Sequence, residues 1–210
     1  AGKRADIHDQ FHHTRQSLGV VVALAAEGWR IALVHGNRPQ VGDELVRNEL
    51  AIDTVAPLPL GVLVAATAGW IGYMIQQSLQ NVLAKAGIDR EVLTVITQTV
   101  VSKEDPRLSE PTKPIGHELS PESAERLQRR GIVTGTDGAK RIRRVVPSPG
   151  PTGIVEVSAV KQLVDGGKIV VAAGGGGPPV YWDEDDGWEG IDAVVDKDRT
   201  AAIVGRALEA

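Results

Sequence analysis

The sequence predicts an α/β fold with a mostly parallel sheet. Amphipathic segments of helical period alternate with short apolar segments, which is the pattern of consecutive strand and helix units. Glycines end several of the expected helices, and no segment is repeated along the chain. Apolar residues form 42% of the 210 residues, which is enough to build a hydrophobic core. We therefore expect one domain over residues 1–210.

The first half of the chain alternates expected helices with expected strands. Gly28 and Gly87 stop two of the helices, and Pro57 and Pro59 break the chain between two others. Residues 91–101 alternate valine, leucine, threonine and isoleucine, which is typical of a strand. In order, we expect helix 7–27, strand 29–34, a loop at 35–39, helix 40–51, helix 62–86 and strand 91–101.

The segment 102–151 differs in composition from the rest of the chain. It holds six prolines before Pro151 together with many charged residues, which disfavours long regular elements. We expect it to form a lid subdomain inserted within the domain. After it we expect helix 152–166, strand 168–173, the glycine run 174–177, an acidic turn at 183–186, a strand that ends near the apolar run 193–195, and a final helix that continues to 210.

Composition limits the classes of function. Lysine and arginine number 23 against 27 aspartates and glutamates, for a net charge of −4, and there are seven aromatic residues, so we expect no nucleic-acid partner. The uncharged stretch 54–84 is interrupted by proline and glycine, which favours a buried helix over a membrane span. The absence of cysteine and of a signal-peptide pattern in residues 1–13 is compatible with a cytoplasmic protein, which is the location that we expect.

Two glycine-containing loops follow expected strands. In open α/β sheets, ligands bind beyond the carboxyl ends of the strands, where loops direct backbone N–H groups at them. Gly36 permits close backbone approach and the Asn37 amide can donate to an oxyanion, although an ordinary turn has the same composition. The run Gly174, Gly175, Gly176 and Gly177 could admit a phosphate to the main chain or form a plain flexible turn.

Two lysines are candidates for contacts with a phosphoryl group. Lys113 lies between Pro111 and Pro114, which stiffen the backbone on either side of it, although a solvated surface lysine is the alternative. Lys197 is flanked by Asp196 and Asp198 directly after an apolar run. A lysine there can neutralise a phosphate while the neighbouring aspartate orients it, or the three residues form a charged turn.

Other charged clusters carry weaker expectations. Lys140, Arg141, Arg143 and Arg144 could bind an anion or form a solvated hairpin. His8, His12 and His13 have no evident third partner for a metal, and the acidic turn 183–186 departs from a calcium-binding loop. We therefore expect no protein-bound metal site.

Several motifs follow one another along the chain: His35-Gly36-Asn37-Arg38-Pro39-Gln40-Val41-Gly42, Gly69-Trp70-Ile71-Gly72-Tyr73, Pro111-Thr112-Lys113-Pro114-Ile115-Gly116, the glycine run with its following prolines, and Asp196-Lys197-Asp198. Taken in this order, they closely resemble the motifs of the carbamate kinase family, which belongs to the amino-acid kinase superfamily. The resemblance implies a three-layer αβα sandwich with a protruding lid, a homodimer, and reversible phosphoryl transfer between Mg-ATP and carbamate. The ATP-forming direction consumes carbamoyl phosphate and ADP in arginine catabolism.

The resemblance also implies roles for individual residues. Gly36 and Asn37 would line the substrate site, and Lys113 would enter it from the lid. Lys197 would neutralise the transferring phosphoryl group, and Asp198 would orient the catalytic lysines or the nucleotide. The glycines at 174–177 would provide backbone along the cleft.

The sequence departs from the family pattern at several points. The family has glycine where this chain has Arg38, and the Gly-Arg-Gly of its lid reads Ala139-Lys140-Arg141 here. The family pattern also extends beyond both ends of this sequence, with a Gly-Gly-Asn-Ala loop before it and a nucleotide-binding half after it. The alternative to a working kinase is therefore a fragmentary or catalytically degenerate homologue that dimerises or binds an anion.

Overall fold

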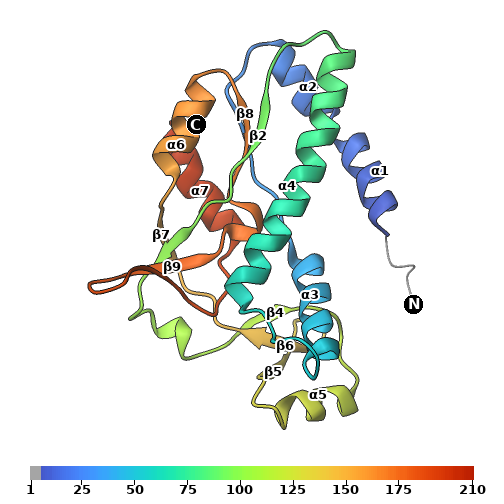
Figure 1. The fold of residues 1–210 in the computed structure, drawn as a ribbon, viewed down its shortest axis with the longest axis vertical. Helices are drawn as coiled ribbons and strands as arrows, with labels where there is room; N and C mark the ends of the chain where they lie inside the picture. The colour runs from blue at the N-terminus through green and yellow to red at the C-terminus, as the bar shows by residue number, and fades with distance from the viewer. Residues whose placement is uncertain (1–5) are drawn as a thin grey trace.

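The computed structural model describes residues 6–210 and gives an α/β architecture (Figure 1). Its helices are α1 (Ile7–Ser17), α2 (Gly19–Ala26), α3 (Arg38–Ala51), α4 (Leu60–Lys85), α5 (Pro121–Gln128), α6 (Val157–Asp165) and α7 (Lys197–Leu208), with 3₁₀ turns η1 (Pro106–Leu108) and η2 (Gly174–Gly176). Its strands are β1 (Ile31–Leu33), β2 (Val92–Thr94), β3 (Thr99–Val101), β4 (Lys113–Ile115), β5 (Thr134–Thr136), β6 (Ile142–Val146), β7 (Pro151–Ile154), β8 (Ile169–Val171), β9 (Pro179–Asp183) and β10 (Gly187–Gly190).

The core is a parallel sheet with strand order β1-β8-β2, covered by helices on both faces. Alternate side chains of β8 point to opposite faces, because side chains in a strand alternate with period two. Ile169 and Val171 pack with residues of α2 and α4, whereas Val170 packs with residues of α6 and α7. Figure 1 shows these helix pairs on opposite sides of the strands. The expected three-layer αβα arrangement is confirmed.

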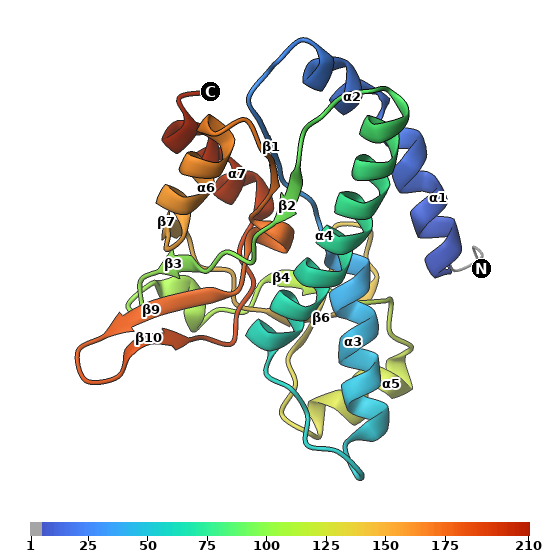
Figure 2. The same ribbon diagram turned by 45° about the horizontal axis from the view of Figure 1, so that its top comes forward.

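A second sheet continues from the core with strand order β10-β9-β3-β7. Its central pair, β3 and β9, is parallel, while its outer pairs are antiparallel. The β9–β10 hairpin carries the expected acidic turn and projects from the body of the molecule (Figure 2). The sheet begins where the glycine-containing turn η2 ends, so η2 lies at the junction of the two sheets.

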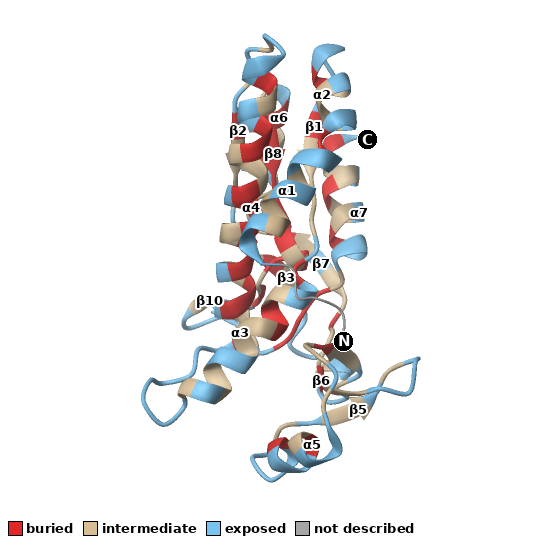
Figure 3. Cartoon of the chain, turned by 90° about the vertical axis from the view of Figure 1, so that its right-hand side faces the viewer, coloured by how far each residue is buried: buried red, intermediate tan, exposed pale blue. Residues whose placement is uncertain are grey.

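A third, antiparallel sheet with order β4-β6-β5 forms within the 102–151 segment, together with α5. It lies at the lower end of the molecule in Figure 3, whereas the buried residues gather on the core strands and the helix faces that meet them. Ile115 and Val146 join this sheet to Val41 of α3 and Val64 of α4 in one apolar cluster. This cluster holds β4 close to the beginning of α3.

The long helix α4 is buried along one side. Leu63, Val64, Leu79 and Leu83 are each at most 2% exposed. The buried positions recur with the helical period. Burial of this face in the core explains why the segment is almost free of charged residues. No helix within residues 6–210 has the length and apolarity needed to cross a membrane.

Four expected elements differ from the structure. The expected helix 7–27 is broken at Leu18, which is buried in the core, because Gly19 weakens helical continuity. The expected strand 91–101 is divided into β2 and β3, since the intervening residues bind other loops: Thr97 accepts from Ala173 N and Gln98 donates to Glu156. Residues 152–154 belong to β7 rather than to the helix that follows. Residues 193–195 are buried but form no strand, and Val194 N donates to Pro147 O instead.

Candidate active site

Two loops meet at the carboxyl end of the core sheet. Because β1 and β8 are parallel neighbours, the loops that follow them begin side by side. The backbone confirms the contact: Gly175 N donates to His35 O at 2.8 Å, and Ala172 N donates to Leu33 O at 2.9 Å. The loop with Gly36 and Asn37 therefore lies directly against the glycine run.

The four glycines of the run are required mainly by close packing. A Cβ on Gly175 would lie 2.1 Å from Asn37 Nδ2, and one on Gly176 would lie 2.5 Å from Val195 O. A Cβ on Gly177 would likewise lie 2.5 Å from Thr97 O. Gly175, Gly176 and Gly177 also have positive φ values of 66°, 92° and 77°, which disfavour any side chain. The glycine run therefore packs closely against the loops that follow β1 and β2 and against the segment before α7.

The glycine run contributes one residue to the cavity lining described below. Gly175 lines this cavity, whereas Gly174, Gly176 and Gly177 are buried in the packing behind it. Of the four glycines that we expect to border the cleft, Gly175 is the member of this lining. Sequence composition could not separate them, because space for a ligand and space for a neighbouring backbone both select glycine.

Asn37 and Gly36 lie where their loop meets α7 and α4. Asn37 is 7% exposed, and its amide Nδ2 donates to Thr67 Oγ1 of α4 at 2.9 Å. Thr67 in turn donates back to the α4 main chain, so Asn37 is anchored to a buried part of that helix. Gly36 is exposed, and a Cβ there would contact the Lys197 side chain at 3.4 Å. Gly36 therefore lets the Lys197 side chain lie directly against the loop.

Lys113 reaches the same region from β4. Its Nζ donates to Asp196 Oδ2 at 2.6 Å, although the two residues are 83 positions apart. Asp196 is also the N-cap of α7 and accepts from Asp198 N at 3.0 Å. The Lys113 ammonium, followed by these backbone donors, lowers the pKa of Asp196. Asp196 therefore stays ionised and holds Lys113 at the beginning of α7.

Sequence reasoning did not assign this role to Asp196. The signal was present, because an aspartate directly before a helical pattern is a preferred N-cap. That the side chain also binds Lys113 could not be inferred, since the contact depends on the packing of the third sheet against α3.

Lys197 and Asp198 form the second ion pair of the site. Lys197 Nζ donates to Asp198 Oδ1 at 2.6 Å, and this hydrogen bond raises the pKa of Lys197. The side chains are 48% and 80% exposed, so both can change partner when an anion binds. Asp198 thus contacts Lys197, and Asp196 contacts Lys113.

These residues surround one cavity of ≈190 Å³. It opens between the beginnings of α3 and α7 and strand β4, which come from distant parts of the chain. Three cations and two carboxylates lie on its wall, and Val41, Ile115 and Val194 form an apolar side. The lining consists of Gly36, Asn37, Arg38, Val41, Lys113, Pro114, Ile115, Gly175, Val194, Val195, Asp196, Lys197 and Asp198.

Larger cavities lie elsewhere but do not bring this chemistry together. One of ≈830 Å³ lies between the beginning of α4 and the β9–β10 hairpin, and Lys103 is its single cation. By contrast, the smaller cavity combines convergent cations with exposed main chain, which is the chemistry that an oxyanion requires. Burial lowers the pKa of the neighbouring His35, so lysine and arginine supply the positive charge there.

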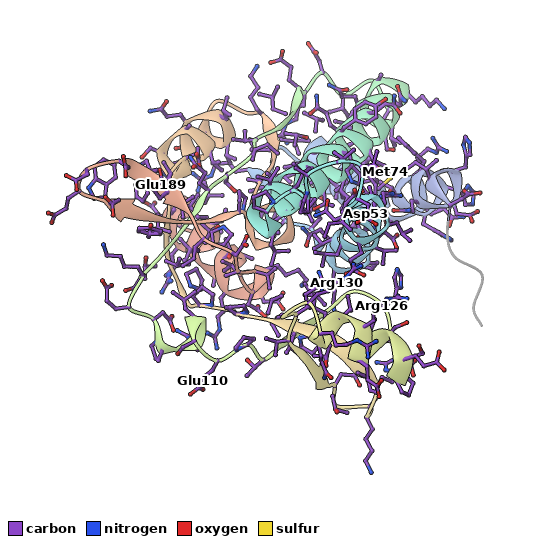
Figure 4. All side chains as sticks on the ribbon, turned by 60° about the horizontal axis from the view of Figure 1, so that its bottom comes forward. Asp53, Met74, Glu110, Arg126, Arg130 and Glu189 are labelled. Atoms are coloured by element: carbon purple, nitrogen blue, oxygen red, sulfur yellow. The ribbon has the colours of Figure 1, made fainter. Side chains whose placement is uncertain are left out.

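The other charged clusters lie outside this cavity. Arg141 and Arg143 both bind Asp137, and Arg144 binds Glu49 of α3, so these arginines fasten the third sheet internally and to the core. In the acidic turn, Asp183 accepts from the backbone of Asp185 at 3.1 Å. Across residues 6–210, no three side chains of the metal-binding types gather around one point. Figure 4 shows further surface charges, with Arg126 on α5, Arg130 in the turn after it and Glu189 on β10.

Comparison with known proteins identifies the family, although no family model matches the sequence. The chain is 42% identical over 200 residues to the carbamate kinase of Pyrococcus furiosus, covering 94% of this chain and 63% of that protein. It is 43% identical over 205 residues to the carbamate kinase of Clostridium perfringens, covering 96% and 65%. The chain thus spans just under two thirds of the length of these curated relatives.

Solved structures agree with these sequence relatives. Carbamate kinase from Giardia lamblia bound to citric acid superimposes with a TM-score of 0.92 at 32% identity, covering all of this chain and 68% of that one. The same enzyme bound to AMP-PNP gives a TM-score of 0.87 at 32% identity. From the ordered motifs, the αβα fold and these relatives together, we conclude that the chain belongs to the carbamate kinase family.

Proposed function

We propose that the protein takes part in reversible phosphoryl transfer between carbamate and Mg-ATP, with the cavity between α3, α7 and β4 as its substrate site. One observation carries the proposal: Lys113 and Lys197, from distant segments, line a single small cavity together with Gly36, Asn37 and Gly175. A family relative bound to AMP-PNP supports the use of a nucleotide. The proposal includes a cytoplasmic location and a role of the ATP-forming direction in arginine catabolism.

The proposed reaction asks the protein for charge neutralisation and positioning. In the ATP-forming direction, the bond between phosphorus and the carbamoyl oxygen breaks, a bond from phosphorus to a terminal ADP oxygen forms, and carbamate leaves with the electron pair. Phosphoryl transfer spreads negative charge over the transferring oxygens, and fixed cations stabilise it without a covalent intermediate. Lys113 and Lys197 can provide this charge once the anion competes with Asp196 and Asp198 for their ammonium groups.

Backbone groups of the loops would complete the substrate site. Gly36 and Gly175 expose main chain toward the cavity because neither carries a side chain. Asn37 donates one of its amide hydrogens to Thr67, so its second hydrogen is available to a ligand. These neutral donors would orient the carboxyl end of carbamate while the lysines hold the phosphoryl end.

ATP formation from carbamoyl phosphate and Mg-ADP tests the proposal. We expect turnover above the spontaneous breakdown of carbamoyl phosphate, and a loss of about 100-fold in kcat for Lys197→Ala, the size of effect that removal of a transition-state donor produces. Lys168→Ala is the matched control, because Lys168 pairs with Glu91 at the opposite end of the core sheet. Equal rates in Lys197→Ala and Lys168→Ala would contradict the assigned role.

A second candidate function is anion binding without turnover. Arg38 favours it, because it puts a bulky cation where the family pattern has glycine. In that case the chain would bind phosphate at the cavity and form no ATP under the same assay.

We also propose that the chain forms a homodimer through α4. Val62, Ala66 and Tyr73 are exposed and recur at helical spacing, so they form an apolar stripe on the outer side of the helix. Ala66→Glu should shift the sedimentation coefficient from dimer to monomer, because it puts a charge in the stripe. Leu50→Glu, at an 82% exposed apolar position on α3, is the control and should leave the dimer intact. A monomeric unmodified chain would contradict the proposal.

A further inference from the structure

We propose that Arg38 is a substrate-binding residue that recognises the phosphoryl group of an acyl phosphate at the cavity. This inference rests on the proposed function, because it names a further ligand contact in the same site. It is supported by the partners that the charged side chains on the cavity wall have within the described residues.

Arg38 is the unpaired cation of the cavity lining. Lys113 is bound to Asp196 and Lys197 to Asp198, each at 2.6 Å. Arg38 is exposed and makes no side-chain hydrogen bond or ion pair within the described residues 6–210. The lining therefore carries one net positive charge, and this charge comes from Arg38.

The backbone fixes Arg38 relative to Lys113. Arg38 is the first residue of α3, whose second turn packs directly on the loop after β4. A Cβ on Gly42 would lie only 2.4 Å from Gly116 Cα, so the two main chains are in contact at that point. Val41 is 2% exposed in the same cluster as Ile115. The beginning of α3 and strand β4 are therefore packed together, which brings the backbones of Arg38 and Lys113 to the wall of one cavity.

The chemistry of the guanidinium suits a phosphoryl group. Arginine is always charged at physiological pH, and its planar fork of N–H donors matches two oxygens of a phosphate. A doubly charged phosphoryl group gains more from this charge than a singly charged carboxylate does. Arg38 therefore favours the phosphorylated substrate over free carbamate, so it strengthens binding of the reactant in the ATP-forming direction.

Titration of the full 210-residue chain with inorganic phosphate tests the inference, with acetate as the singly charged comparison. Backbone amide shifts of Gly36 and Gly175 report binding at the cavity at constant ionic strength. We expect Arg38→Ala to raise the phosphate Kd about tenfold, the effect of losing one charge-assisted contact, and to change the acetate Kd less. Arg38→Lys should recover part of the loss, because it keeps the charge without the fork.

Arg199→Ala is the matched control. Arg199 is also an exposed arginine in the first turn of a helix, but it does not line the cavity. Its replacement should change the phosphate Kd less than about twofold, since a solvated charge outside the site is largely screened. Melting temperatures equal to that of the unmodified chain would confirm that all variants are folded.

Three results would overturn the inference, and they differ in what they leave standing. An unchanged phosphate Kd in Arg38→Ala would mean that Arg38 makes no contact, while the proposed function would stand. Tighter binding in Arg38→Ala would mean that Arg38 blocks the cavity. No shift of Gly36 or Gly175 with phosphate in the unmodified chain would remove both this inference and the proposed substrate site.

Discussion

The core sheet and the third sheet are held by different forces. The central strand β8 is formed by Ile169, Val170 and Val171, which are at most 1% exposed and lie between two layers of helices. The β4-β6-β5 sheet buries fewer apolar side chains, and its arginines bind Asp137 and Glu49. We infer that the core is stabilised mainly by hydrophobic burial, and that the third sheet depends in addition on ionised carboxylates.

This difference bears on function because the cavity lies where the two regions meet. Lys197 begins a helix of the core, whereas Lys113 lies in a strand of the third sheet. Substitutions in the core, in the third sheet and at the lysines of the cavity therefore test the two regions separately.

The largest effect is expected from Ile169→Ala in the middle of the core. Ile169 is fully buried, so its truncation leaves a cavity and should lower the free energy of unfolding by about 2–5 kcal/mol. Ile7→Ala, at a 45% exposed position, is the matched control and should change it by less than about 0.5 kcal/mol. Chemical denaturation measures both. Similar losses for the two variants would contradict a core held by burial.

A smaller, local effect is expected from acid. Hydrogen bonds from the backbone of Arg141 and the side chain of Arg143 lower the pKa of Asp137, and those from Arg107 and Gly150 N lower that of Asp105. A carboxyl whose pKa is lowered on folding stabilises the fold above its unfolded pKa, and the contribution is lost as the pH falls toward the folded pKa. The third sheet should therefore lose amide protection below about pH 4, before the core does.

Amide hydrogen exchange at Arg143 and Val170 measures this difference. Asp137→Asn should produce the same loosening of β6 at neutral pH and make it independent of acid, because its amide cannot ionise. Simultaneous loss of protection in both sheets on acidification would show that they unfold as one unit.

The sequence predicted elements that depend on local pattern and missed those that depend on packing. The two ends of α4 were predicted within two residues, because Pro59 begins it and Gly87 stops it. The prediction that a strand ends at residues 193–195 is wrong. An apolar pattern indicates that residues are buried, but it does not indicate the partners of their backbone hydrogen bonds. The division of strand 91–101 likewise arises from contacts with distant residues, whereas the break at Leu18 comes from the local effect of Gly19.

The candidate site was predictable at the level of motifs but not of contacts. Gly36, Asn37, Lys113, Lys197 and Asp198, to which the resemblance implies roles, all line one cavity. The contact between Asp196 and Lys113 was not predicted from the sequence. Three of the four glycines permit close packing of neighbouring segments and do not line the cavity. Both points depend on which segments meet in space, which residue spacing along one chain does not encode.

We propose that the third sheet brings a catalytic cation, Lys113, to a site of the core sheet. Measuring ATP formation from carbamoyl phosphate and Mg-ADP by Lys113→Ala, beside Lys103→Ala as a control from the same 102–151 segment, tests it most directly. We predict that kcat falls about 100-fold for Lys113→Ala, with an unchanged melting temperature, because the lost charge acts on the transition state. Equal rates for the two variants would contradict the claim and leave Lys113 as a structural partner of Asp196.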